Sequence, residues 1–258
     1  MRNYLLFQKL IKPYLQAHLI YTEIFTMRFN SQTLADRTYN DQNSTTNLSW
    51  TTSSNKVLRN TYALLAMTLL FSAAVATASV SYQWPAPGIV LTLAGYFGLL
   101  FAVYKFQNSA WALPAVFSLT GFMGYTLGPL LTHSLSLPGG GQTVSLALAA
   151  TGATFLALSG YVLVTRRDFS FMGGFLFCGM VIAMVAGLAA IFFEMTALSL
   201  AVSAMVAMLS AGMILFETSR IVHGGENNYV LATVSLFVSI FNLFTSLLSL
   251  FGFGNSSE

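Results

Sequence analysis

Two charged residues at the end of an apolar stretch, Glu217 and Arg220, have the clearest capacity for chemistry in this chain. They stand three positions apart in the segment Gly-Met-Ile-Leu-Phe-Glu-Thr-Ser-Arg, so on a helix they share a face and can form an ion pair. An ionisable group at or inside a bilayer is energetically unfavourable and therefore suggests function. The alternative is a structural pair at the membrane rim, held close to water.

A second set of polar side chains lies in the apolar segment 229–251. Ser235, Ser239, Asn242 and Ser246 are spaced i, i+4, i+7 and i+11, which places them on one face of a helix. That face is not expected to contact lipid. It either hydrogen-bonds to other helices, which is the favoured interpretation, or lines a wet cavity beside Glu217.

Other catalytic patterns are missing from the sequence. There is no HExxH, no Gly-rich phosphate loop and no CxxC, and the single Cys178 rules out a Cys-rich metal site. The histidines, His18, His133 and His223, all lie outside the apolar stretches. We therefore expect no enzymatic activity, no cofactor, no metal and no nucleic-acid partner.

The composition indicates the element that must position these groups, a membrane-spanning helix. Of 258 residues, 55% are hydrophobic and only 7% are charged, where soluble domains average about 25%. Such a chain cannot cover a water-facing surface, which nearly excludes a soluble globular enzyme. Seven continuous apolar stretches contain no Asp, Glu, Lys or Arg: 61–80, 88–104, 111–131, 143–164, 171–192, 197–216 and 229–251.

These stretches predict an all-α membrane protein, a bundle of seven transmembrane helices. About 20 helical residues cross the roughly 30 Å hydrocarbon core, and a helix satisfies its own backbone there. The stretch 88–104 is the shortest and the weakest candidate. All 11 Lys and Arg fall in the N-terminal tail or after the second, fourth and sixth stretches. The positive-inside rule then predicts a cytoplasmic N-terminus and a periplasmic C-terminal tail, 255–258.

The N-terminal region differs in composition from the seven-helix domain, 57–254. Residues 31–56 are rich in Ser, Thr, Asn, Gln and Asp, so we expect residues 1–56 to form a mobile cytoplasmic tail. Two interpretations of residues 1–26 remain open. They form a short amphipathic helix on the membrane surface, or translation begins at Met27 and they are not part of the protein.

Small residues recur at helical spacing in two stretches. Gly124 and Gly128 form a GxxxG pattern, and Gly179, Ala183 and Gly187 form an i, i+4 stripe. Such stripes let helix backbones approach closely in lipid. Packing inside the bundle is favoured over homodimerisation.

Several segments resemble the Bax-inhibitor (TMBIM) family of membrane proteins. The resemblance covers residues 53 to 254 and is carried by LFETSRIVHGGENNYVLATVSLFVSIFNLFTSLLSLFGFG, SSNKVLRNTYALLAMTLLFSAAVATAS, TGFMGYTLGP and YVLVTRRDFSFMGGFL. It implies a seven-helix fold in the bacterial inner membrane. For the bacterial branch it also implies binding to the membrane protease FtsH and its HflK–HflC partners. Such a protein is a slow FtsH substrate that restrains degradation of other membrane proteins, with the unstructured tail as the protease's grip.

The wider family implies a second activity, a leak of Ca²⁺ or protons gated by two acidic residues. The resemblance maps the sixth-helix carboxylate onto Glu217 and the seventh-helix carboxylate onto Ser239, so a shared-proton pair cannot form. Glu217, Arg220, Ser239 and Asn242 remain the pore and gating candidates of this alternative. A substrate transporter is disfavoured, because charged midplane residues and a clear internal repeat are lacking.

Overall fold

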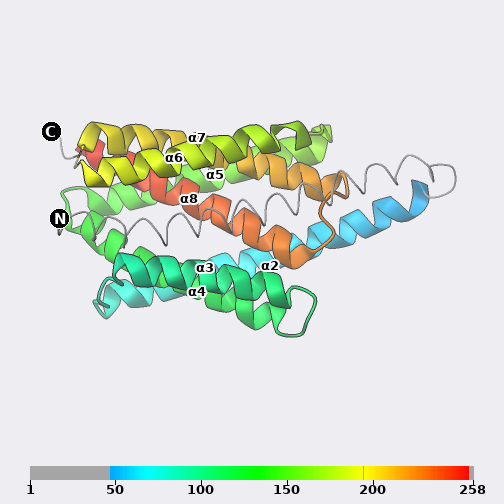
Figure 1. The fold of residues 1–258 in the computed structure, drawn as a ribbon, viewed down its shortest axis with the longest axis horizontal. Helices are drawn as coiled ribbons and strands as arrows, with labels where there is room; N and C mark the ends of the chain where they lie inside the picture. The colour runs from blue at the N-terminus through cyan, green and yellow to red at the C-terminus, as the bar shows by residue number, and fades with distance from the viewer. Residues whose placement is uncertain (1–46, 194, 256–258) are drawn as a thin grey trace, which may run out of the picture. The chain divides into compact units, whose positions relative to one another are not determined.

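The computed structural model describes residues 47–193 and 195–255, which form an all-α arrangement (Figure 1). The described residues from Ser53 onward form one compact unit, and the packing below is the packing within this unit. Its elements are α2 (Asn47–Ser81), α3 (Ile89–Phe106), α4 (Ala112–Ser136), α5 (Gly140–Thr165), the 3-10 helix η1 (Ser170–Met172), α6 (Gly173–Phe192), α7 (Thr196–Val222) and α8 (Tyr229–Asn255).

The described residues confirm the all-α class and the seven helices. Six of them are long and apolar enough to cross a membrane, while α3 has a shorter apolar run, Val90–Phe106. This is the stretch that was shortest in the sequence. Of the predicted tail 1–56, residues 1–46 lie outside the described residues, as does the question of a start at Met27, and residues 47–56 belong to α2. The direction in which the bundle crosses the membrane stays a prediction.

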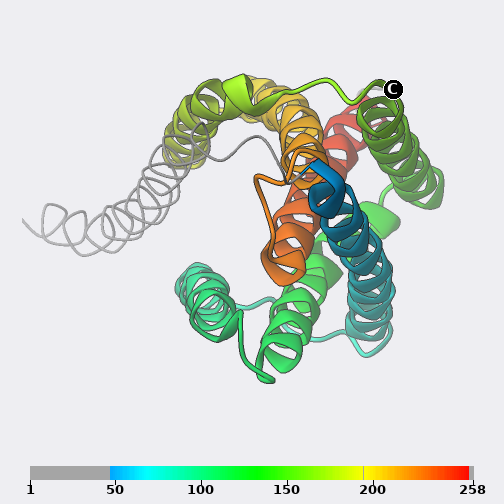
Figure 2. The same cartoon turned by 90° about the vertical axis from the view of Figure 1, so that its right-hand side faces the viewer.

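Helix α8 lies at the centre of the packing. It contacts α7, α5 and α4, and the hydroxyl oxygen of Thr233 lies 3.3 Å from the Thr61 carbonyl oxygen of α2. Figures 1 and 2 show α8, coloured orange to red, running among the other helices. Its side chains Leu236 and Phe237 are almost fully buried in the main apolar cluster, together with Leu65 of α2 and Leu119 of α4. Apolar packing around α8 therefore holds the bundle together.

Helix α4 passes through Pro129 and continues to Ser136, although a proline inside a helix commonly kinks or ends it. Proline has no N–H to donate to the carbonyl four residues earlier, that of Tyr125. The Ser79 hydroxyl of α2 donates to this carbonyl at 3.4 Å instead. A neighbouring helix thus replaces the missing bond, and α4 keeps its helical path.

Both small-residue stripes lie at helix–helix contacts within the chain. A Cβ on Gly124 would collide with the backbone carbonyl of Ser72 in α2, and one on Gly128 would collide with Ser79. On α6, Ala183 is buried, a Cβ on Gly179 would press into Leu209 of α7, and one on Gly187 would touch Val202.

Candidate functional site

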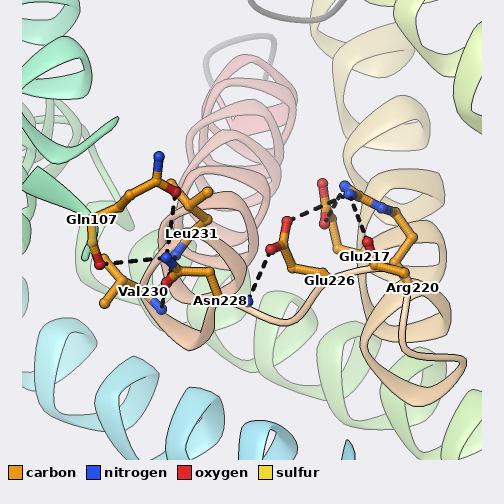
Figure 3. Close-up of polar contacts among 8 residues, drawn as sticks. Gln107, Glu217, Arg220, Glu226, Asn228, Val230 and Leu231 are labelled. Atoms are coloured by element: carbon orange, nitrogen blue, oxygen red, sulfur yellow. Dashed lines mark hydrogen bonds and ion pairs between the residues drawn. The ribbon is translucent and has the colours of Figure 1, made fainter. Parts of the chain in front are cut away.

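Arg220 lies between two buried carboxylates where α7 ends (Figure 3). Its guanidinium nitrogens Nη1 and Nη2 lie 3.4 Å from Glu217 Oε2 and 3.4 Å from Glu226 Oε2. All three side chains are at least 90% buried, and the guanidinium also lies over the ring of Phe216 at 5.4 Å. The arrangement is an ionic triad, defined here as Glu217, Arg220 and Glu226, with one more negative than positive formal charge.

The turn after α7 explains how Glu226 returns to Arg220. Gly224 has a φ of +74°, a conformation that glycine adopts without strain, and it allows the chain to reverse. The N–H groups of Gly225 and Glu226 then donate to the Arg220 carbonyl at 2.8 and 3.2 Å. Arg220 Nη2 also donates to the Gly225 carbonyl. Glycine after a basic last turn is the expected helix ending, and here it also builds the triad.

The sequence predicted the Glu217–Arg220 pair but missed Glu226. The α8 position assigned to the second carboxylate is occupied by Ser239, as predicted, and the second carboxylate beside Arg220 comes from the α7–α8 connection instead. The sequence did contain a signal for a turn at this point, the pair Gly224–Gly225 directly before Glu226. The contact between Arg220 and Glu226, six residues apart, becomes evident only from the left-handed turn in the structure.

The polar row of α8 does not join the triad by any described hydrogen bond. Ser239 is buried, and its hydroxyl donates to the Ser235 carbonyl of its own helix at 2.9 Å. Asn242 is half-buried, and its carbonyl accepts a bond from the Thr245 hydroxyl. The hydroxyls of Thr233, Thr245 and Ser249 likewise donate to carbonyls one turn earlier.

Asn228 continues the network from the triad to the α3–α4 connection (Figure 3). Its N–H donates to Glu226 Oε1 at 3.1 Å, and its side-chain oxygen accepts from Val230 N at 2.9 Å, which caps the start of α8. Its side-chain amide donates to Gln107 Oε1 at 3.3 Å and to Asn108 Oδ1 at 3.1 Å. The end of α7, the start of α8 and the α3–α4 connection are therefore tied together.

A hollow of about 510 Å³ lies beside this network, lined by Gln107, Asn108, Ser109, Ala110, Ala112, Leu113, Asn227, Asn228 and Tyr229. None of these side chains is charged. Within residues 47–193 and 195–255, no three His, Cys, Asp or Glu side chains gather into a possible metal site. The part of the chain that the structure describes thus offers an ionic triad and, beside it, a hollow without charged side chains.

The connection between α5 and η1 is fixed to the same end of α7. Phe169 N donates to the Ser219 hydroxyl at 2.9 Å, and the His223 ring lies 3.0 Å from the Arg166 carbonyl. The three connections that follow the second, fourth and sixth apolar stretches therefore meet at one end of the bundle. Lys and Arg also stand at this end: Arg166 and Arg167 lie in the α5–η1 connection, and Lys105 and Arg220 lie in the last turns of α3 and α7.

A family model described as "Inhibitor of apoptosis-promoting Bax1" matches residues 54–256. The chain belongs to the Bax1-I family. The Bax1-I match covers the whole described bundle apart from the start of α2, and it confirms the resemblance that the sequence segments carried.

Two Bax1-I relatives are half identical to this chain. The Modulator of FtsH protease YccA of Escherichia coli K12 is 51% identical over 203 residues, which are 79% of this chain and 92% of that protein. In strain O6:H1 a protein with the same match is named Inner membrane protein YccA. An uncharacterized protein of Pseudomonas aeruginosa is 50% identical over 202 residues, 78% of this chain and 91% of its own length. This chain is thus a close homologue of YccA.

Proposed function

We propose that this protein is an inner-membrane modulator of the FtsH protease, and not an enzyme itself. The observation that carries the proposal is the 51% identity to YccA, which extends over 79% of this chain and 92% of that protein. In this role the protein binds FtsH and the HflK–HflC complex and restrains degradation of other membrane proteins.

The proposed orientation places the N-terminus and the ionic triad on the cytoplasmic side. The hydrogen bonds from Asn228 to Gln107 and between His223 and Arg166 support it, because they gather the Lys- and Arg-bearing segments at one end. A reporter fused to the last residue tests the orientation, which places this residue in the periplasm. Reporter activity on the cytoplasmic side alone contradicts the proposed orientation.

A slow substrate needs a segment that the protease can grip and a body that resists extraction. We assign the grip to the tail ahead of α2, whose polar composition favours mobility. We assign the resistance to the packing around α8 and to the triad, because separating Arg220 from its carboxylates leaves buried charges unpaired, at about 3–5 kcal/mol.

The test uses the tagged full-length protein solubilised from membranes. FtsH is expected to co-purify, and mass spectrometry that finds none overturns the proposed function. Turnover is then compared with that of a variant lacking residues 27–46, a deletion that ends before Asn47 and leaves α2 intact. Slower FtsH-dependent turnover is expected, and an unchanged rate removes the tail from the mechanism while leaving the binding intact.

A second candidate function is a leak of protons or Ca²⁺. It is favoured by one observation, the two buried carboxylates of Glu217 and Glu226 on a single guanidinium. The Ser239 hydroxyl, which donates within its own helix, offers it no support. Flux into liposomes decides between the two functions, because robust pH-gated Ca²⁺ entry that Glu217→Gln abolishes would make the leak the main activity.

A further inference from the structure

Both ring nitrogens of His223 face carbonyl oxygens. Nδ1 lies 2.8 Å from the Ser219 carbonyl, one turn earlier on α7, and Nε2 lies 3.0 Å from the Arg166 carbonyl, in the α5–η1 connection. Carbonyl oxygens only accept hydrogen bonds, and a neutral imidazole carries a single N–H. Only the imidazolium, with two N–H groups, can donate to both partners at once.

The neutral ring has one other partner within reach, the Ser219 hydroxyl at 3.4 Å from Nδ1. That hydroxyl accepts a bond from Phe169 N and has a single hydrogen, which can go to the Arg167 carbonyl at 3.3 Å or to Asp168 Oδ1 at 3.5 Å. The neutral ring can donate to only one of the two carbonyls. With its proton on Nδ1 the ring loses the bond to the Arg166 carbonyl, and with its proton on Nε2 it turns a lone pair to the Ser219 carbonyl or accepts the Ser219 hydroxyl hydrogen, which then leaves the connection. Compared with the imidazolium, the neutral ring therefore holds the connection and α7 together with fewer or poorer bonds.

The charges around His223 come from three elements. The α5–η1 connection provides Asp168 and the exposed Arg166 and Arg167, α7 provides Arg220 and Glu217, which pair with each other, and the α7–α8 connection provides Glu226. η1 and α6 contain no charged residue. Partial burial raises the pKa of Asp168, but the hydrogen bonds from Ser170, the charge of His223 and the bond from Ser219 together lower it. The Asp168 carboxylate therefore stays ionised at neutral pH.

We propose that His223 is a proton-controlled clasp, which fixes the connection 166–169 to the end of α7 when its ring is charged and releases the connection when its ring is neutral. The turn 224–226 follows directly, so release of the clasp also loosens the support of the ionic triad. This inference does not depend on FtsH binding. It adds a response to pH at the end of the bundle where the three connections meet.

Hydrogen exchange of the full-length protein in detergent micelles tests the clasp. Amide protection, corrected for the intrinsic pH dependence of exchange, is measured from about pH 5.5 to about pH 8, the range in which histidine changes charge. The Phe169 amide and its neighbours are expected to lose protection about tenfold as pH rises, since each release removes a charge-assisted bond. Protection that stays constant over this range overturns the proposal.

Two variants and one spectrum make the test specific. His223→Gln should remove the pH dependence, while the matched control His133→Gln, at an exposed histidine near the end of α4, should keep it. The ¹⁵N signals of the labelled wild-type rings show protonation directly and do not require a variant to fold. Both His223 nitrogens should change protonation signal together with the Phe169 amide, and a Phe169 amide that changes with a different midpoint contradicts the clasp.

Discussion

Helices α8 and α6 are comparably apolar, yet they occupy opposite kinds of position. Half of the most apolar stretch of α8 is buried by protein, against 17% for α6. Helix α8 contacts α7, α5 and α4, while the contacts of α6 are with α7 and η1. Hydropathy therefore predicts that a helix spans the membrane, but it does not predict whether the helix lies inside the bundle. The polar row of α8 did predict it, because hydroxyls avoid lipid.

The largest expected difference between the two helices concerns the loss of stability when one large side chain is removed from each. Phe237 of α8 is 1% exposed and Phe175 of α6 is 71% exposed. Phe237→Ala is expected to lower the free energy of unfolding by about 3–4 kcal/mol, because it leaves a cavity. Phe175→Ala should change it by less than about 0.5 kcal/mol. Unfolding in mixed detergent micelles measures both, and equal losses would mean that α8 is not the packing centre.

A smaller difference is expected when a methyl group is added to each small-residue stripe. Gly124→Ala, in the α2–α4 contact near the centre, meets a backbone carbonyl and should destabilise by about 1–3 kcal/mol. Gly179→Ala, on α6, meets the flexible end of Leu209 and should lose less than about 1 kcal/mol.

The matched control for both substitutions is Gly152→Ala on α5, where an added Cβ meets nothing within 4 Å. It should be neutral or stabilising by about 0.5 kcal/mol, since alanine favours the helix. Thermal unfolding of the three variants ranks them, and a larger effect at Gly179 than at Gly124 would reverse the assignment of inner and outer contacts.

The smallest predicted effect concerns the connection that leads into α6. The folded-state pKa of Asp168 is lowered, so its contribution to stability is present at neutral pH and disappears as pH falls through that value. Asp168→Asn should reduce stability slightly at pH 7, by a difference that vanishes in acid. Unfolding midpoints measured across this pH range check the sign, and a variant that gains stability at pH 7 contradicts it.

Helix positions were predictable from the sequence because each apolar stretch has the length that a bilayer requires. Their ends were less predictable. Helix α7 continues past Phe216 to Val222 because Glu217 and Arg220 pair with each other, and α4 continues past Pro129 because α2 supplies a hydrogen bond. The extension of α4 depends on a tertiary partner and that of α7 on a pair of charged residues, and a hydropathy pattern contains neither.

The candidate site was predictable only where its members share a helix. Glu217 and Arg220 follow from i, i+3 spacing. Glu226 requires the left-handed turn at Gly224, and the contact of His223 with Arg166 joins residues 57 positions apart. Long-range contacts of this kind are set by how the helices assemble, for which one sequence alone carries no signal.

The bond from Ser79 to the Tyr125 carbonyl has a consequence for mechanical unfolding. Force applied from the amino end reaches α2 before any other helix of the bundle. Withdrawal of α2 removes the hydroxyl from the proline-freed carbonyl and leaves that oxygen bare in hydrocarbon, where an unsatisfied polar group is several kcal/mol less stable. A single proline in the third helix thus raises the barrier to pulling out the first.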